Sequence, residues 1–168
     1  MLSAKMQKVL NTHLNEEFYS SYLYLSMAAY FEAKNLKGFA NWMRIQAAEE
    51  HMHGMKFFDF ILQKGGKVTL AQIAAPKIEW NSISEVFAET LKHEQKITGL
   101  INKLVEVAMQ EKDFATNNFL QWFVTEQVEE EANVEEIIQK IEMIGDNKSG
   151  LYMLDNELGA RTLTPAAV

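Results

Sequence analysis

Four long stretches with helical spacing of apolar residues, none broken by proline, dominate this chain of 168 residues. Apolar residues that recur every three or four positions form one face of an α-helix, and a proline inside such a stretch would end or kink it. The two prolines, Pro76 and Pro165, both lie outside the long stretches. The pattern therefore predicts an all-α protein with four helices of about 28 to 32 residues, each on the order of 42 to 48 Å long.

Local signals mark the ends of these helices. Gly65-Gly66 is a good stop for the second helix, Ser82-Ile-Ser-Glu85 is a capping box for the third, and Asp113 can cap the fourth. A shorter helix follows near the C-terminal end. The expected helices cover about residues 3–34, 36–64, 82–111, 113–144 and 151–158.

The lengths of the connections predict the topology. Very short turns join the first helix to the second and the third to the fourth, so each pair should form an antiparallel hairpin. The connection between the second and third helices, with slight strand-like alternation near 67–78, has about 17 residues, ample at ~3.3 Å per residue to run along the whole bundle. We expect one four-helix bundle with a long crossover between helices 2 and 3, in a single domain over 1–168.

Composition restricts the chemistry. The chain has 16 basic and 23 acidic residues, a formal charge of −7, which disfavours nucleic-acid binding and attracts cations. It has no cysteine, which excludes disulfides, cysteine-based zinc and iron–sulfur sites, and thiol catalysis. A tight metal site would need His and carboxylate ligands, which suit iron or manganese. With no signal-type apolar segment and no run long enough to span a membrane, we expect a cytoplasmic protein without membrane contact.

Glu50 and His53 form a Glu-x-x-His pair inside the second helical stretch. Residues three apart share one face of a helix, so both side chains can reach one ion. Further acids stand in the other three helical stretches, at Glu17, at Glu94 and in the segment 126–130. An acid from each remaining helix together with Glu50 and His53 could make a ligand set for two iron ions.

The positions of these acids matter more than their number. Glu17 shares the apolar stripe of the first helix, and Glu94 and Glu130 lie in the stripes of the third and fourth helices; the first stripe is expected to contain Leu10, Leu14, Phe18, Leu25 and Ala28. A buried, unpaired carboxylate is costly. Each acid alone is best interpreted as a solvated residue, but four helices with one inward acid each are hard to explain by chance. His13 lies one turn before Glu17 and His93 is next to Glu94, positions that suit residues supporting a ligand or surface residues. A lone histidine is usually structural, and this is the interpretation for His13, His51 and His93.

Over nearly its whole length the chain resembles the bacterial non-haem ferritins, a branch of the ferritin-like di-iron family. The resemblance is carried by four segments in order: Asn15-Glu-Glu17-Phe-Tyr-Ser-Ser-Tyr-Leu-Tyr24, Glu49-Glu50-His-Met-His53, Lys92-His-Glu94-Gln, and Asn118-Phe-Leu-Gln-Trp122-Phe-Val-Thr-Glu126-Gln-Val-Glu-Glu130. A short Glu-x-x-His alone would be a weak signal, whereas all four segments at these separations are a strong one.

The resemblance implies a role for each matching residue. Glu17 and His53 would hold one iron, Glu94 and Glu130 the second, and Glu50 would bridge them. An additional third iron site is matched by Glu49, Glu126 and Glu129, with Glu130. Positions that support the catalytic centre are matched by Tyr24 and Gln127, and a nearby aromatic position by Trp122.

The chain differs from several related families, and these differences favour the bacterial non-haem ferritins. Bacterioferritins carry a second Glu-x-x-His on the fourth helix and a haem-binding methionine just after the second-helix glutamate, where this chain has His51, so no haem is expected. Rubrerythrin-like peroxidases need a cysteine-ligated iron module. The small DNA-protecting ferritins take ligands from other positions, and animal heavy-chain ferritins lack an acid matching Glu130.

The function implied is that of an iron-storage subunit with ferroxidase activity, which oxidises Fe(II) with O₂ or H₂O₂ and stores the ferric product as a mineral. The partners implied are copies of the same chain, in an octahedral shell of twenty-four subunits with the short last helix at a symmetry axis. Two rival interpretations remain: a di-iron oxidase or peroxidase that stores no iron, and a shell subunit without a metal centre.

Overall fold

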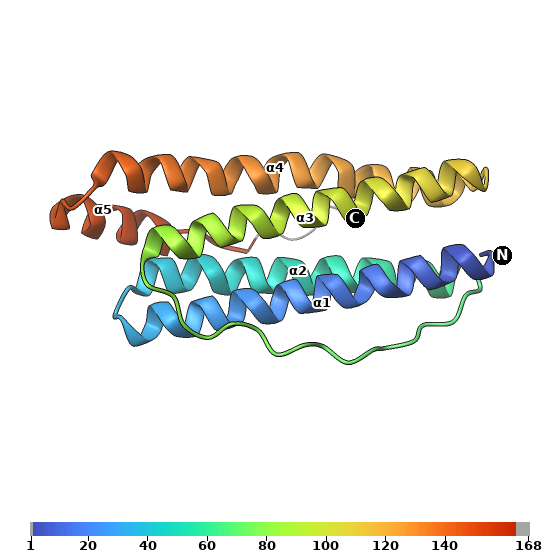
Figure 1. Ribbon diagram of the computed structural model, residues 1–168, viewed down its shortest axis with the longest axis horizontal. Helices are drawn as coiled ribbons and strands as arrows, with labels where there is room; N and C mark the ends of the chain where they lie inside the picture. The colour runs from blue at the N-terminus through green and yellow to red at the C-terminus, as the bar shows by residue number, and fades with distance from the viewer. Residues whose placement is uncertain (1, 164–168) are drawn as a thin grey trace.

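The computed structural model describes residues 2–163, so residues 1 and 164–168, including Pro165 and the two ends of the expected domain, lie outside it. Within the described range the chain forms four long helices and a short fifth (Figure 1). The predicted all-α fold is confirmed, and the predicted long helices are correct to within a residue or two at their ends. The helices are α1 (Ala4–Ala33), α2 (Lys37–Gln63), α3 (Ile83–Gln110), α4 (Phe114–Ile144) and α5 (Lys148–Gly159).

Side-chain caps begin the third and fourth helices as predicted. Oγ of Ser82 accepts from the backbone N–H of Glu85 at 3.0 Å, and Oδ1 of Asp113 accepts from the N–H of Thr116 at 3.1 Å. The capping box is only half formed, because the Glu85 carboxylate accepts from the backbone N–H of Asn81 and not from that of Ser82. Backbone N–H groups at the starts of α3 and α4 thus donate to side chains only a few residues away, as expected for helix starts.

Two details of the prediction were wrong. The fifth helix starts at Lys148 instead of about residue 151, because Oδ1 of Asn147 accepts from the N–H groups of Ser149 and Gly150 and caps the helix earlier. Leu25, placed in the apolar stripe of α1 by its spacing, is 51% exposed. A helix of 30 residues drifts relative to a straight stripe, so the stripe includes Leu23, Tyr24 and Met27 instead.

The predicted long crossover follows the bundle from the end of α2 to the start of α3 (Figure 1). It contains no strand in the described structure, and its backbone groups are bonded by polar side chains of α1. Asn11 bonds the backbone of Lys67 and Thr69, and Oγ of Ser26 donates to the carbonyl of Lys77 at 2.7 Å. Side chains of α1 therefore supply the partners that an irregular segment needs.

The short helix α5 is fixed to the start of α2. Leu36, the N-cap of α2, makes no side-chain cap, and Oδ1 of Asp155 in α5 instead accepts from the N–H groups of Gly38 and Phe39, at 2.8 and 3.0 Å. The approach needs glycine, because a Cβ at Gly38 would lie 1.5 Å from the carbonyl oxygen of Asp155. The C-terminal part of the described chain is thus held against α2.

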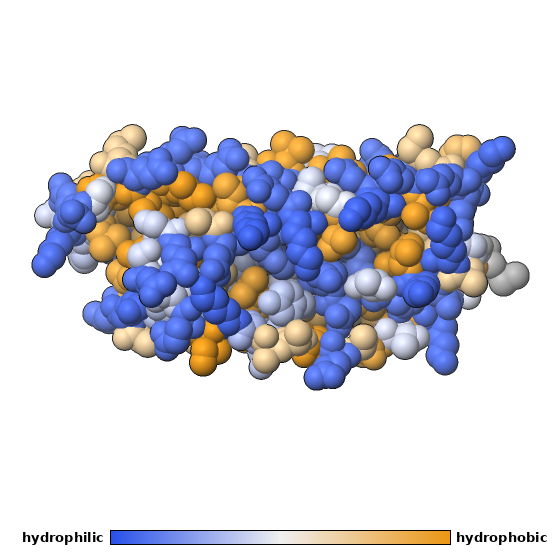
Figure 2. All heavy atoms as spheres, viewed as in Figure 1, coloured by the Kyte–Doolittle hydropathy of each residue, from blue (hydrophilic) through white to orange (hydrophobic). Residues whose placement is uncertain are grey.

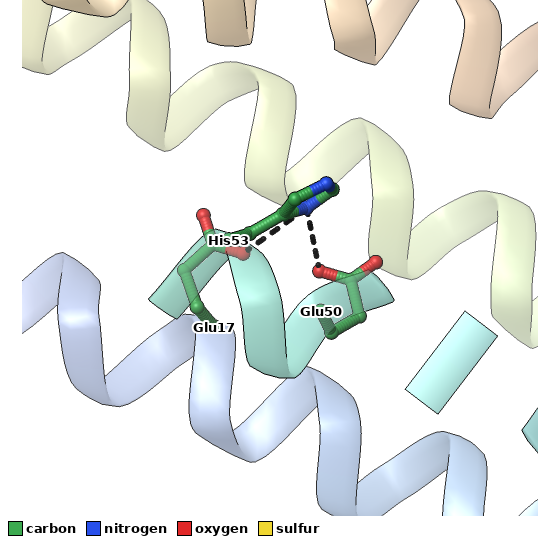
Figure 3. Close-up of side chains that lie close together, drawn as sticks. All are labelled: Glu17, Glu50 and His53. Carbon is green, nitrogen blue, oxygen red and sulfur yellow. Dashed lines mark ion pairs between the residues drawn. The ribbon is translucent and has the colours of Figure 1, made fainter. Parts of the chain in front are cut away.

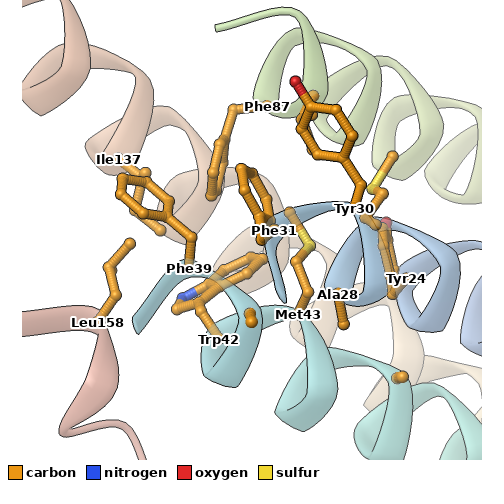
Figure 4. Packing of buried hydrophobic residues seen from close by; sticks show 14 of the residues in the cluster. Tyr24, Ala28, Tyr30, Phe31, Phe39, Trp42, Met43, Phe87, Ile137 and Leu158 are labelled. Atoms are coloured by element: carbon orange, nitrogen blue, oxygen red, sulfur yellow. The ribbon is translucent and has the colours of Figure 1, made fainter. Parts of the chain in front are cut away.

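The interior contains two apolar clusters with a polar band between them. One cluster lies toward the α5 end and is rich in aromatic rings, among them Phe31, Phe39 and Phe87 (Figure 4). The other lies toward the opposite end, around Leu14, Phe57 and further residues of all four long helices. The buried polar side chains of the band, between the two clusters, are His13, Glu17, Ser20, Gln46, Glu50, His53, Thr90, His93, Glu94, Gln127 and Glu130.

None of the five helices within residues 2–163 combines the length and the hydrophobicity that crossing a bilayer requires.

Candidate metal centre

The polar band contains an inward-facing acid from each of the four long helices. Glu17 comes from α1, Glu50 from α2, Glu94 from α3 and Glu130 from α4, and none is more than 4% exposed. Each belongs to a stripe of otherwise apolar residues, so helix packing carries the carboxylate into the interior. The inward orientation inferred from the sequence is confirmed for all four acids.

His53 lies between the acids of α1 and α2 (Figure 3). Its Nδ1 is 3.4 Å from Oε2 of Glu50 and 4.0 Å from Oε2 of Glu17. One ligand atom from each of these three buried residues lies within 4.8 Å of the others. Carboxylate oxygens and an imidazole nitrogen at this spacing are a donor set for a transition-metal ion such as iron.

The other nitrogen of His53 faces α4. Its Nε2 lies 3.8 Å from Oε1 of Glu126, and His53, Glu126 and Glu130 form a second group whose ligand atoms lie within 4.8 Å of one another. The ring also meets Trp122 edge to face, at a centroid distance of 5.3 Å. His53 therefore links the α2 and α4 sides of the band.

Glu94 is held by neutral donors. The hydroxyl of Tyr24 donates to its Oε1, and Nε2 of Gln127 donates to its Oε2 at 3.1 Å and to its backbone carbonyl at 3.2 Å. Gln127 also lies 3.3 Å from Oγ1 of Thr98. Tyr24 and Gln127, expected from the resemblance to support the centre, thus both contact the same carboxylate, and Glu94 is in neither of the compact ligand groups.

The acids differ in their readiness to ionise. Burial raises the pKa of Glu17, but attraction to His13 and His53 outweighs it and leaves the pKa below its ordinary value. Burial, reinforced by the neighbouring acids, raises the pKa of Glu50 and of Glu130 well above the ordinary value. For Glu94, burial raises the pKa to about 7 although the Tyr24 and Gln127 hydrogen bonds oppose it. Protons therefore occupy part of the band at neutral pH.

Glu17 supplies the clearest sign that the band suits a cation. Within the described structure neither of its side-chain oxygens has a hydrogen bond of normal geometry, although Nε2 of His13 is 2.7 Å from Oε1. A buried carboxylate with unsatisfied oxygens is costly, and a bound metal ion would remove that cost. The donor set of carboxylates and imidazole therefore fits iron.

The residues matched to a third iron site are not gathered in one group. Glu126 lies beside His53 and Glu130, while Glu129 is exposed on α4. Glu49, 16% exposed, forms an ion pair with Arg161 from the segment after α5. Of the acids matched to the third site, Glu126 and Glu130 are therefore grouped with His53, whereas the carboxylate of Glu49 contacts the guanidinium of Arg161.

Two contacts of the centre were missed by sequence reasoning. His13, interpreted as a lone structural histidine, contacts Glu17, and Gln46 donates to Glu130 at 2.6 Å and to Glu50 at 3.3 Å. Each lies one helical turn before an acid of the centre, so the i, i+4 spacing could have identified both. His93, in contrast, bonds Oγ of Ser20, in keeping with a structural role.

An antiparallel bundle with one long crossover and inward acids from four helices, one in a Glu-x-x-His pair, defines the class of di-metal carboxylate bundle proteins. The family model for the ferritin-like domain matches residues 7–144. The chain belongs to the ferritin family, and the resemblance inferred from its sequence is confirmed.

Known relatives agree with this assignment. The bacterial non-heme ferritin of Staphylococcus aureus (strain USA300) is 42% identical over 96% of this chain and 98% of its own length, and that of Staphylococcus epidermidis is 41% identical over the same shares. Among solved structures, a closed form of the Archaeoglobus fulgidus ferritin, engineered by mutagenesis, is 52% identical with a TM-score of 0.96, over 98% of this chain and 100% of that one. An open-pore ferritin from the same archaeon has a TM-score of 0.95, over 96% and 99%.

Proposed function

We propose that this chain is a subunit of an iron-storage protein, in which the polar band of the bundle oxidises Fe(II) and passes the ferric product to a mineral. Glu17 and His53 bind one Fe(II), Glu94 and Glu130 bind the second, and Glu50 bridges the two. The observation that carries this proposal is a buried band with one inward acid from each of four helices, in which ligand atoms of Glu17, Glu50 and Glu130 lie close to His53.

Charge balance supports two ions as the load of the centre. Four ionised carboxylates carry four negative charges, which two Fe(II) ions neutralise. Oxidation to Fe(III) adds two positive charges that the band does not balance, so the product leaves more readily when oxide or hydroxide accompanies it. The same ligand set therefore binds the substrate and releases the product.

The oxidant we propose is O₂ or H₂O₂. Two Fe(II) ions give up two electrons, the number that converts O₂ and two protons to H₂O₂, or H₂O₂ and two protons to two water molecules. Carboxylate oxygens are hard donors that favour Fe(III) over Fe(II), which lowers the cost of oxidation. The bundle contributes fixed ligand positions, and the iron itself carries the electrons.

We extend the proposal to a third iron site and to the absence of haem. In this proposal an iron ion binds beside the di-iron centre before or after oxidation. The acids for this third site are Glu49, Glu126, Glu129 and Glu130. His51, exposed on α2, stands where haem-binding relatives carry methionine, so the proposal includes no haem.

Storage needs an enclosed volume, and we propose that copies of the chain provide it as an octahedral shell of twenty-four subunits. Hydrophobic residues lie among hydrophilic ones on the face seen in Figure 2. Large apolar side chains are exposed on several elements of the isolated chain, and contacts between subunits would bury some of them. They include Leu70, Ile78, Phe114, Val128, Met143, Tyr152 and Met153.

The experiment that tests this function is aerobic addition of Fe(II) to the metal-free protein, followed by size-exclusion chromatography that tracks iron and protein together. We expect far more iron than the proposed sites can hold to elute with a very large particle. Iron at no more than site stoichiometry, on a small species, would instead favour a di-iron oxidase or peroxidase that stores nothing.

A further inference from the structure

Arg161, two residues beyond the end of α5, reaches the side of α2 next to the metal centre. Its Nη2 donates to Oε2 of Glu49 at 2.5 Å, and its Nη1 donates to Oε1 of Gln46 at 3.0 Å. The guanidinium carbon lies 4.6 Å from the ring centroid of Trp42, a cation–π contact. Three contacts on one helix therefore hold the guanidinium in place.

The backbone around Arg161 is fixed without the help of its side chain. Nδ2 of Asn41 donates to the carbonyl oxygens of Leu158, Gly159 and Arg161, at 3.2, 3.4 and 3.1 Å. Asp155 adds the contact with the start of α2 described above. The guanidinium can therefore leave Glu49 while the segment after α5 stays against α2.

Glu49 is next to the metal centre, because it directly precedes Glu50 on α2 and its partner Arg161 contacts Gln46, which donates to Glu130 and Glu50. Glu126 and His53 act electrostatically on its carboxylate, and burial leaves its pKa raised even though Arg161 opposes that shift. Glu126 in turn belongs to the compact group with His53 and Glu130. The carboxylate of Glu49 pairs with the Arg161 guanidinium in this structure, and an ion bound beside Glu126 would compete for it.

We propose that Arg161 is a built-in counter-cation for Glu49, and that a metal ion fills the third site only as the guanidinium releases this carboxylate. The inference rests on the proposed third site. Two cations that share one carboxylate repel each other, so the metal must offset the lost ion pair. Consequently the third site is weaker than the di-iron pair and fills after it, which suits an ion in transit.

Arg161 also has a defined effect on Gln46. A guanidinium can only donate, so it fixes the amide oxygen of Gln46 toward itself and leaves the amide nitrogen to donate to Glu130 and Glu50. The orientation of Gln46 therefore depends on a donor at position 161 and not on the charge of that donor. A test variant should keep a donor at this position, which Arg161→Gln does, while removing the charge.

The test is calorimetric titration of the metal-free, full-length protein with Zn(II), which binds such ligands without any redox step. In Arg161→Gln we expect the first two equivalents to bind as in the unmodified chain and the third to bind roughly five to ten times more tightly, as loss of a competing, partly buried ion pair predicts. Arg44→Gln is the matched control, because Arg44 pairs with Glu32 at the surface and its loss changes the net charge equally.

A third equivalent that binds equally tightly to both chains, or to neither, would overturn the inference. Absence of the first two equivalents from the unmodified chain would count against the di-iron centre itself, so the two failures are distinct. A crystal structure of the zinc-loaded unmodified chain is the second test and needs no variant. We expect zinc on Glu49 with Arg161 displaced; zinc there with the ion pair intact, or no zinc on Glu49 beside a filled di-iron site, would contradict the proposal.

Discussion

The two halves of the candidate centre use the same kind of ligand in different surroundings. Glu17, on one side, lies beside two imidazoles, those of His13 and His53, and has a lowered pKa. Glu94 and Glu130, on the other side, receive hydrogen bonds from a phenol and from amides, and their pKa values are raised.

The difference shows that burial alone does not set the charge of an acid. All of these carboxylates are almost fully buried, yet attraction to imidazole favours the ionised form, whereas neutral donors offset only part of the cost of burial. The Glu17 half is therefore ready for a cation at neutral pH, whereas Glu94, with a pKa of about 7, is still partly protonated there and must lose that proton. We expect the first metal to bind at Glu17 and His53 and the second at Glu94 and Glu130.

Removing Glu50, the acid between the halves, should have the largest effect. Loss of the bridge in Glu50→Ala should slow the fast phase of Fe(II) oxidation by more than about 100-fold, the upper range for mutation of a residue that only supports a metal ligand. Stopped-flow absorbance of Fe(III) measures the rate. Glu106→Ala, which removes an exposed acid of α3, is the control, and an unchanged fast phase in Glu50→Ala would refute the bridge.

Gln46 and His13 allow the halves to be weakened one at a time. Gln46→Leu removes the donor to Glu130 and Glu50, so the second metal should bind about tenfold more weakly. His13→Leu removes the partner of Glu17 and should weaken the first metal to a similar extent, while His13→Gln, which keeps an N–H near the same position, should restore most of the affinity. Anaerobic Co(II) titration followed by visible absorbance separates the two steps.

Equal weakening of both metals by either leucine variant would show that the halves are not independent. Failure of His13→Gln to recover the affinity lost in His13→Leu would show that packing, and not the polar contact with Glu17, is the role of His13.

The smallest effect we predict is on pH dependence. The pKa of Glu94 is about 7, above its ordinary 4.5, so this carboxyl is mostly protonated at pH 6 and mostly ionised at pH 8. The affinity for the second metal should therefore rise several-fold over this range, whereas that for the first should change less. Calorimetry in buffers of different ionisation enthalpy counts the protons released at each step.

The same shift has a consequence for the stability of the metal-free chain. A raised pKa means that the contribution of Glu94 is most favourable below its unfolded pKa and is lost as the pH rises through 7. The melting temperature of Glu94→Gln should accordingly fall less between pH 5 and pH 8 than that of the unmodified chain. Parallel curves for the two chains would contradict the pKa assigned to Glu94.

Much of the fold and of the candidate site could be predicted from the sequence because the signals for them are local. The long helices follow from uninterrupted spacing and caps such as Asp113, and the inward acids follow from stripes that Glu17 or Glu94 share with apolar neighbours. Contacts across long separations gave no such signal: Arg161 meets Glu49 only because α5 docks on α2, and the carboxylate of Asp155 caps a helix more than a hundred residues away. The unequal pKa values also depend on three-dimensional partners.

The most direct test of the central claim is a crystal of the metal-free protein soaked anaerobically with Fe(II) and measured at the iron absorption edge. We predict two anomalous peaks within the polar band, one between Glu17 and His53 and one between Glu94 and Glu130, with the carboxylate of Glu50 touching both. Iron bound only at surface acids, with no peak inside the bundle, would contradict the account.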